Sequence, residues 1–174
     1  MLEKPAQTAV PIHPLLRDRW SPRAFDPARA LTEAEILALL EAARWAPSCY
    51  GDQPWRFMVW NRQTEPQGWQ AAFDCLSEGN HLWVKDVPLL IAVFAVPDFR
   101  HDGKPNRWAQ YDTGAAAMSL CLQAVALGLA AHQMGGFDAQ RLKATFGVPP
   151  EVTAMAMIAV GQRGAPERLP EALR

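Results

Sequence analysis

Arg19-Trp20-Ser21-Pro22-Arg23-Ala24-Phe25 is the most informative stretch of this sequence, and it follows an apolar helical start at Leu15-Leu16. It carries two guanidinium groups and one hydroxyl within five positions. Arginine binds phosphate through a planar, permanently charged fork, and a hydroxyl between two such forks adds a neutral donor. A solvated basic turn would explain the same residues, because short basic runs are common. This stretch alone leaves both interpretations open.

A second motif follows one helix later. Thr32-Glu33-Ala34-Glu35 predicts a capping box, in which Thr32 accepts from the amide of Glu35 and Glu35 reaches back. The helix that it opens ends at Pro47. Pro47-Ser48-Cys49-Tyr50-Gly51-Asp52-Gln53-Pro54-Trp55 comes next. Because the two motifs follow each other in this order, a binding role for residues 19–25 is favoured over a solvated turn.

Together the motifs resemble the nitroreductase family of FMN enzymes. That family opens with Arg-x-Ser-x-Arg-x-Phe and continues, after a helix, with Ala-Pro-Ser-x-x-x-x-Gln-Pro-Trp and a strand. Ala46-Pro47-Ser48 and Gln53-Pro54-Trp55 stand at that spacing. Two further stretches match the family: Tyr111-Asp112-Thr113-Gly114-Ala115 before a long apolar helix, and the flavin-face loop within 128–138. The resemblance runs from about Pro14 to Gly161, and its specificity lies in four motifs in order.

Strands and helices alternate along the chain, which favours a layered sheet with helices on both faces. Strands are expected at 57–60, 89–96, 130–134 and 153–160, and helices at 66–77, 108–127 and between Asp138 and Gly147. This pattern leaves parallel and antiparallel pairing open. The resemblance implies an α+β fold with three layers, a mostly antiparallel sheet and an intertwined homodimer. The 174 residues favour a single domain, with 1–13 as an extended N-terminal arm and 162–174 as a short C-terminal tail.

Composition excludes several functions. The net charge of -1 argues against nucleic acid as a partner, because phosphate backbones favour clustered positive charge. Cys49, Cys75 and Cys121 lie far apart without a CxxC pair, so we expect neither disulfides nor a zinc site, and a cytoplasmic location. The four histidines show no metal-ligand spacing, and we expect no metal. Gly114–Ala131 is uncharged and 18 residues long but rich in alanine, which predicts a buried helix and no membrane span.

The resemblance implies a role for each residue of the first motif. Arg19, Ser21 and Arg23 would form the phosphate cradle and supply donors to the flavin ring, with Arg23 stabilising the anionic reduced flavin near N1 and the C2 carbonyl. Trp20 occupies a slot that the family varies, and a packing role explains it at least as well. Asn80 matches a position whose amide bonds the pyrimidine edge. A turn asparagine before a strand is the alternative.

The stretch after the third expected strand would face the reactive side of the flavin. By resemblance, Gln133, Met134 and Gly135 lie along the dimethylbenzene-to-N5 side, and the amide of Gly135 donates to N5. Gly135-Gly136 would let the backbone approach the ring closely, because glycine has no Cβ. A plain tight turn would explain the two glycines without a ligand.

Pro47, Ser48, Cys49 and Gln53 resemble the segment that reaches the flavin from the other subunit, in a family of homodimers with two flavins at the interface. Cys49 is interpreted as a small interface residue, because no His–Asp pattern accompanies it as for a nucleophile. Trp55 is interpreted as a packing anchor. The family often has Ser-Ser-x-Asn after the proline, and this chain lacks that asparagine. Asp112, with Tyr111, either borders the substrate pocket or caps and packs within the long helix.

The resemblance implies an oxidoreductase that passes hydride from NAD(P)H through flavin N5 to an electron-poor small molecule, such as a nitroaromatic or a quinone, by a ping-pong mechanism. No catalytic side chain is named, because the flavin carries the difficult step. Two alternatives stay open. One is other FMN chemistry, such as activated-alkene reduction, dehydrogenation or dehalogenation. The other is a non-enzymatic dimeric binding or sensing protein, because the family's basic C-terminal segment is represented only by Arg163, Arg168 and Arg174.

Overall fold

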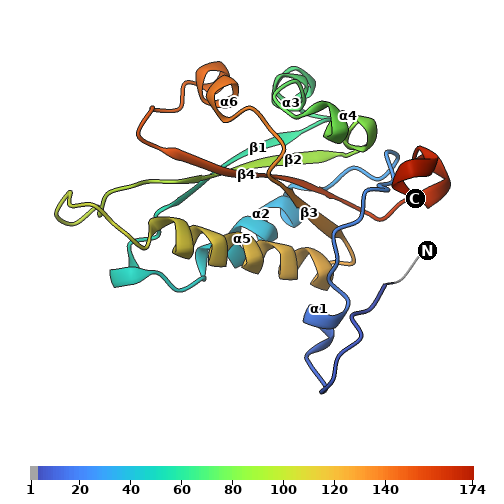
Figure 1. Ribbon diagram of the computed structural model, residues 1–174, viewed down its shortest axis with the longest axis horizontal. Helices are drawn as coiled ribbons and strands as arrows, with labels where there is room; N and C mark the ends of the chain where they lie inside the picture. Colours follow the sequence, from blue (N-terminus) through green and yellow to red (C-terminus); the bar gives the residue numbers. More distant parts are fainter. Residues whose placement is uncertain (1–3) are drawn as a thin grey trace.

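The computed structural model of the chain describes residues 4–174 and centres on one four-stranded sheet (Figure 1). The strands are β1 (Trp55–Asn61), β2 (Leu89–Ala95), β3 (Ala130–Met134) and β4 (Thr153–Gly161). Their order across the sheet is β1-β2-β4-β3, and every neighbouring pair is antiparallel. The α+β fold with a mostly antiparallel sheet, which the resemblance implied, is therefore confirmed.

Helices cover both faces of the sheet. Figure 1 shows α2 (Glu33–Arg44) and α5 (Ala109–Ala126) on one face, and α3 (Pro66–Phe73), α4 (Glu78–Val84) and α6 (Ala139–Phe146) on the other. The short helix α1 (Pro14–Arg17) lies below the body near the C-terminal end of α5, next to the irregular residues 4–13. Residues 1–3 of the expected arm lie outside the described residues. The tail after β4 contains two short 3-10 turns, at Pro166–Arg168 and Glu171–Leu173.

The predicted helix ends are confirmed by their hydrogen bonds. The amide of Glu35 donates to Thr32 Oγ1 at 3.3 Å, and the amide of Thr32 donates to the Glu35 carboxylate at 2.8 Å. Asp138 caps α6 by accepting from the amide of Arg141 at 2.9 Å. Gly147 ends the same helix with a φ of 66°, a conformation that glycine adopts without steric cost.

The central strand β2 is buried along its whole length, which fits its continuous apolar sequence. Its residues alternate between two cores, because successive side chains of a strand point to opposite faces. Leu90 and Phe94 belong to the core that includes residues of α3, α4 and α6, whereas Leu89 and Ile91 belong to the core with α2 and α5. Both faces of β2 therefore need a helical cover.

One predicted helix is wrong in its extent. The helix expected over 66–77 ends at Phe73, and a second helix, α4, follows it. The helix is interrupted there because Cys75 O accepts from the amide of Asp138 at 2.8 Å and Leu76 pairs with Phe137. Asn80 consequently lies inside α4, so its interpretation as a turn residue is wrong.

The apolar helix α5 packs against the sheet and α2. It buries Ala116, Leu120 and Ala124, each with no exposed surface, in the second core. Among residues 4–174, no helix is both long and apolar enough to cross a membrane.

Candidate functional site

The 19–25 loop lies against β3, which is an edge strand of the sheet. His132 on β3 places its ring Nδ1 2.8 Å from the carbonyl oxygen of Pro22. Because a carbonyl can only accept, Nδ1 carries the proton and donates it. The other contact of the imidazole is with the Trp83 ring of α4, with the ring centroids 4.6 Å apart. Loop, strand and helix therefore meet at His132.

A second attachment holds the C-terminal end of the loop. Residues 24–26 pair with residues 162–164, directly after β4, through Asp26 N to Gln162 O and Gly164 N to Ala24 O, both at 2.9 Å. The expected C-terminal tail therefore begins as a partner of the loop.

The glycine in this pairing is required by the close approach of the two chains. A Cβ on Gly164 would lie 2.5 Å from the carbonyl carbon and oxygen of Phe25, a separation that real Cβ atoms do not show. Arg163 also donates from Nη2 to Asp18 O at 3.0 Å. Residues 162–164 therefore hold the loop at two points, through Asp18 just before it and through residues 24–26 at its C-terminal end.

The polar side chains of the loop have no hydrogen-bond partner among residues 4–174. Ser21 and Arg23 are exposed and Arg19 is half-buried. Neither arginine forms a hydrogen bond or ion pair with residues 4–174. Arg19 lies close enough to influence the thiol of Cys121, and Arg23 to influence His132. The two guanidinium groups therefore lie beside β3 and α5, and their N–H donors are free to bind a ligand.

Trp20, for which the resemblance left a cofactor contact and a packing role open, makes contacts within the chain. Two cations lie near its ring, with Lys4 Nζ 5.4 Å and Arg163 Cζ 5.6 Å from the ring centroid. Such contacts are attractive because the face of an indole ring is electronegative. Its buried indole N–H has no partner among the described residues.

The loop after β3 contains two glycines with different surroundings. A Cβ on Gly136 would lie 2.6 Å from Ser77 Oγ and 2.9 Å from Asn80 Nδ2, whereas a Cβ on Gly135 would meet nothing within 4 Å. Gly136 O accepts from Asn80 Nδ2 and from the amide of Ser77, both at 2.9 Å. Asn80 therefore anchors this loop to α4, while its side-chain oxygen has no partner among residues 4–174. Space is open only on the Gly135 side.

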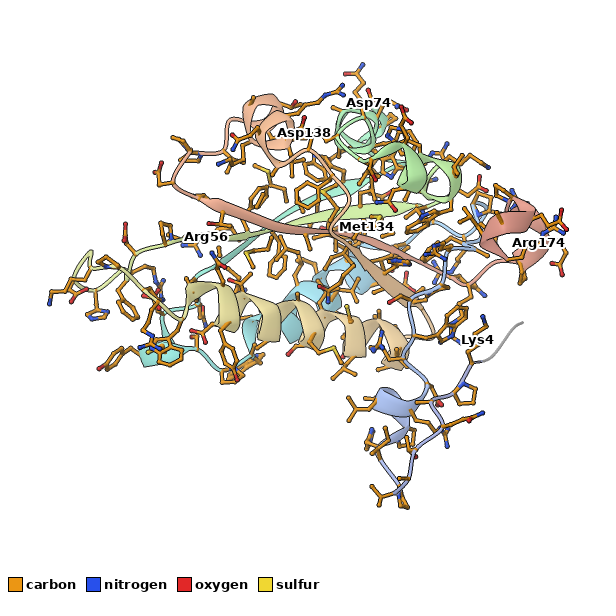
Figure 2. All side chains as sticks on the ribbon, in the orientation of Figure 1. Lys4, Arg56, Asp74, Met134, Asp138 and Arg174 are labelled. Atoms are coloured by element: carbon orange, nitrogen blue, oxygen red, sulfur yellow. The ribbon has the colours of Figure 1, made fainter. Side chains whose placement is uncertain are left out.

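The side chains of Gln133 and Met134, which precede the two glycines, point to opposite faces of the sheet. Met134 is buried in the core, and Figure 2 places it at the centre of the molecule. Its side chain therefore does not line a surface site, and only its backbone remains for contact with a ligand. Gln133 is exposed on the α5 side, where its amide lies 3.4 Å from the sulfur of Cys121. Gln133, Cys121 and Arg19 consequently form one neighbourhood.

The segment 47–53 lies elsewhere, at the N-terminal end of α5 (Figure 1). The amide of Cys49 donates to the buried carboxylate of Asp112 at 2.9 Å, and the amide of Gln53 donates to Ser48 Oγ at 3.0 Å. Pro47 is exposed, and Ser48, Cys49 and Gln53 are half-buried. Of the two roles considered for Asp112, the structure supports packing within the protein.

A strained turn projects from this segment. Tyr50 and Gln53 have φ values of 54° and 52°, and they are the only non-glycine residues with positive φ among residues 4–174. Tyr50 is 84% exposed, and its ring contacts only Phe99 and His101 of the neighbouring loop among the aromatic residues that the structure describes, so burial does not explain the strain. Buried Asp52 accepts from the amide of Arg100 at 2.9 Å and ties the turn to the 98–107 loop. Strain of this kind is found mainly at functional sites.

His132, Arg163 and Asp52 also organise the site, and none of them was assigned this role from the sequence. Each acts through a partner distant in sequence, and His132 is 110 positions from Pro22. The sequence signals were the places of His132 and Asp52 inside the matching motifs and the basic character of Arg163 in the C-terminal segment. Trp55 is buried, in agreement with a packing anchor.

Burial also sets the protonation of several groups. Desolvation lowers the pKa of His132, and the nearby Arg23 charge lowers it further, while the bond to Pro22 acts in the opposite direction. Burial raises the pKa of the Cys121 and Cys75 thiols. Within the described part of the chain, no group of three or more His, Cys, Asp or Glu side chains could hold a metal ion.

Comparison with known proteins gives several matches. Protein DrgA of Synechocystis is 32% identical over 170 residues, which cover 83% of this chain and 80% of DrgA. An uncharacterised 15.4 kDa protein of Mycolicibacterium smegmatis is 42% identical over 72 residues, and the match spans about half (48%) of that protein.

Solved structures share the fold. A crystal structure described as an oxidoreductase containing FMN superposes with a TM-score of 0.92 at 36% identity, covering 99% of this chain and 88% of that one. An FMN-dependent nitroreductase of Clostridium difficile has the same fold at 22% identity, with a TM-score of 0.72 and 87% of each chain covered. The family model described as "Nitroreductase family" matches residues 16–162. This chain therefore belongs to the nitroreductase family.

Proposed function

We propose that this protein is an FMN-dependent oxidoreductase that transfers electrons from NAD(P)H to an electron-poor small molecule, a nitroaromatic or quinone, in a ping-pong reaction. The main observation behind the proposal is the open pair of guanidinium groups around Ser21, on a loop attached to the sheet at both His132 and the 162–164 segment. Two like charges held close together repel each other unless an anion binds between them. The phosphate and the electron-rich reduced ring of FMN would supply that negative charge.

The residues on the loop and on β3 fit a flavin. Arg19, Ser21 and Arg23 would hold the phosphate and one edge of the ring. Gly135 offers a backbone without any neighbour at the position of a side chain, so a flat ligand can lie against it. The free oxygen of Asn80 is an acceptor for a ring N–H.

When bound, FMN supplies the hydride acceptor and donor that no side chain of this protein replaces. The protein contributes a fixed position and a fixed electrostatic field. Arg23 would place a positive charge beside the ring edge that carries the negative charge of the reduced flavin. Gln133 and the Gly135 backbone would lie along the other side of the ring. No side chain is needed to move a proton in this scheme.

We further infer that two copies of the chain complete each site. Cys49 contacts Asp112 of α5, whereas Arg19 lies near Cys121 of the same helix. Asp112 and Cys121 are nine residues apart, about 14 Å along the helix axis. One copy therefore presents its flavin half and its 47–53 segment at separate places. The outward side of α5, which includes exposed Tyr111 and half-buried Leu122, is available for a second copy.

The test of the cofactor is the visible absorption spectrum of the purified protein before and after anaerobic addition of NADPH or NADH. A flavin spectrum that bleaches supports the proposal. A protein that stays colourless after FMN is supplied and the excess removed would refute it. A panel of anaerobic acceptors, including nitroaromatics, quinones and activated alkenes, then distinguishes nitro or quinone reduction from other FMN chemistry.

Complementation tests the composite site. We would combine Arg19→Ala/Arg23→Ala in one chain with Ser48→Ala/Gln53→Ala in another and co-express the two. If the halves come from different copies, each mixed dimer holds one intact site and regains one flavin. If both halves serve the same chain, every site stays defective and no flavin returns.

A further inference from the structure

We infer that His132 is the positioning residue for the cofactor-binding arginines, acting through its hydrogen bond to the carbonyl of Pro22. This inference rests on the proposed function and extends it to a residue to which the family resemblance gave no role. The bond joins the middle of the loop to β3 at 2.8 Å. Pro22 lies between Ser21 and Arg23, so its position sets where both of these side chains project.

The loop forms few hydrogen bonds of its own. Among residues 4–174, the His132–Pro22 bond is the only hydrogen bond formed by residues 19–23. Proline has no N–H, so its carbonyl is the only backbone group through which Pro22 can be fixed. The attachments at Asp18 and at 24–26 lie outside the five residues that bear the binding groups. Without His132, residues 19–23 would keep the packing of Trp20 but would have no hydrogen bond between the two ends of the loop.

The imidazole is itself held in one orientation. Its ring packs at 31° against Trp83, which is buried and stacks in turn with Phe25 at 6.1 Å. Trp83 therefore contacts both His132 and the last residue of the loop motif. Packing on Trp83 directs the Nδ1–H toward the Pro22 carbonyl, and a side chain supported in this way is what a positioning residue requires.

Two substitutions separate the bond from the stacking. In His132→Asn the side-chain amide can occupy the place of Nδ1 and donate to Pro22 O, although the stacking is lost. His132→Phe keeps a ring on Trp83 and removes the donor. His132→Gln places its amide near the position of Nε2, which is the wrong site. If the bond is what matters, the Asn variant resembles the wild type and the Phe and Gln variants do not.

His81 provides a matched control. Its Nε2 lies 2.9 Å from Phe73 O and its ring stacks on Phe73 at 4.5 Å, so it combines the same two interactions between α3 and α4. His81→Phe removes a bond of the same kind away from the loop. It should change thermal stability without changing the behaviour of residues 19–23.

Two readouts are combined. The first is the FMN dissociation constant, measured by fluorescence quenching, for which loss of one net hydrogen bond predicts a rise of roughly 3- to 10-fold in the Phe and Gln variants. The second is the rate of limited trypsin cleavage after Arg23 in protein stripped of FMN. Cleavage should accelerate in the same two variants and stay at the wild-type rate in His132→Asn and His81→Phe.

Each outcome decides the question. Faster cleavage with unchanged FMN affinity would overturn the inference, because the bond would then hold the loop without serving the cofactor. Equal losses in the Asn and Phe variants would also overturn it and point to general packing. If the wild type binds no FMN, the proposed function fails, and the cleavage series still shows separately whether the bond orders the loop.

Discussion

Gly164→Ala is the substitution that most directly tests the attachment of the 19–25 loop to the sheet. The new Cβ would lie 2.5 Å from the carbonyl carbon and oxygen of Phe25 and 3.0 Å from the amide nitrogen of Asp26. These are backbone atoms, so no side-chain rotation relieves the contact. The two chains must separate, and the Asp26 N to Gln162 O and Gly164 N to Ala24 O bonds lengthen or break.

The expected loss of stability follows from these contacts. Two backbone hydrogen bonds are worth about 1–3 kcal/mol together in net terms. Strain left in the repacked backbone brings the total to about 2–4 kcal/mol, which reaches above the usual cost of about 1–3 kcal/mol for overpacked sites because the contact is with backbone atoms. For a domain of this size, each kcal/mol lowers the melting temperature by roughly 2–4 °C, so we expect a decrease of roughly 4–16 °C.

The assay is thermal unfolding of FMN-free protein at one protein concentration, followed by FMN titration. The control is Gly79→Ala, because a Cβ at this exposed position of α4 would meet nothing within 4 Å. It should raise stability by up to about 1 kcal/mol, since alanine favours a helix more than glycine does. A Gly164→Ala protein as stable as wild type, with the same FMN affinity, would show that the 24–26 attachment is not needed.

Three further predictions follow from local chemistry. His132 has a lowered pKa, so the folded state binds fewer protons than the unfolded state, and wild-type stability should fall as pH drops below about 6.5 and level off below the folded pKa. Urea unfolding should show this step in wild type and not in His132→Phe; an identical pH profile for the two proteins would contradict it. Cys75 and Cys121, buried with raised pKa values, should resist a thiol reagent at pH 8 until the protein unfolds, and their rapid modification in folded protein would show that burial does not protect them. Thr32→Ala should cost about 1 kcal/mol in urea unfolding, the usual worth of an N-cap, whereas no loss would mean that the capping box is dispensable.

Local features were predictable from the sequence because their causes are local. The capping box at Thr32, the Asp138 cap and the Gly147 end depend on residues within one or two helical turns. The continuous apolar run of β2 required cover on both faces whatever the topology. The positions of Arg19, Ser21 and Arg23 identified a candidate anion site, and the structure leaves these groups without internal partners.

Other features could not be predicted because their partners are remote in the chain. The helix expected over 66–77 ends early because Cys75 and Leu76 pair with residues that follow β3, more than sixty positions later. Gly136 was interpreted as a place for a ligand, yet its lack of a side chain is needed for packing on Ser77 and Asn80. Local propensity contains no information about either contact.

Most strands and helices, their caps and the candidate anion site could be located from the sequence, because these depend on composition and short-range spacing. Long-range packing set the antiparallel order β1-β2-β4-β3, the separation of the 47–53 segment from the 19–25 loop, and the attachment of that loop to His132 and the 162–164 segment. Those features depend on how distant parts of the chain meet when the two cores close, and no local pattern specifies that meeting.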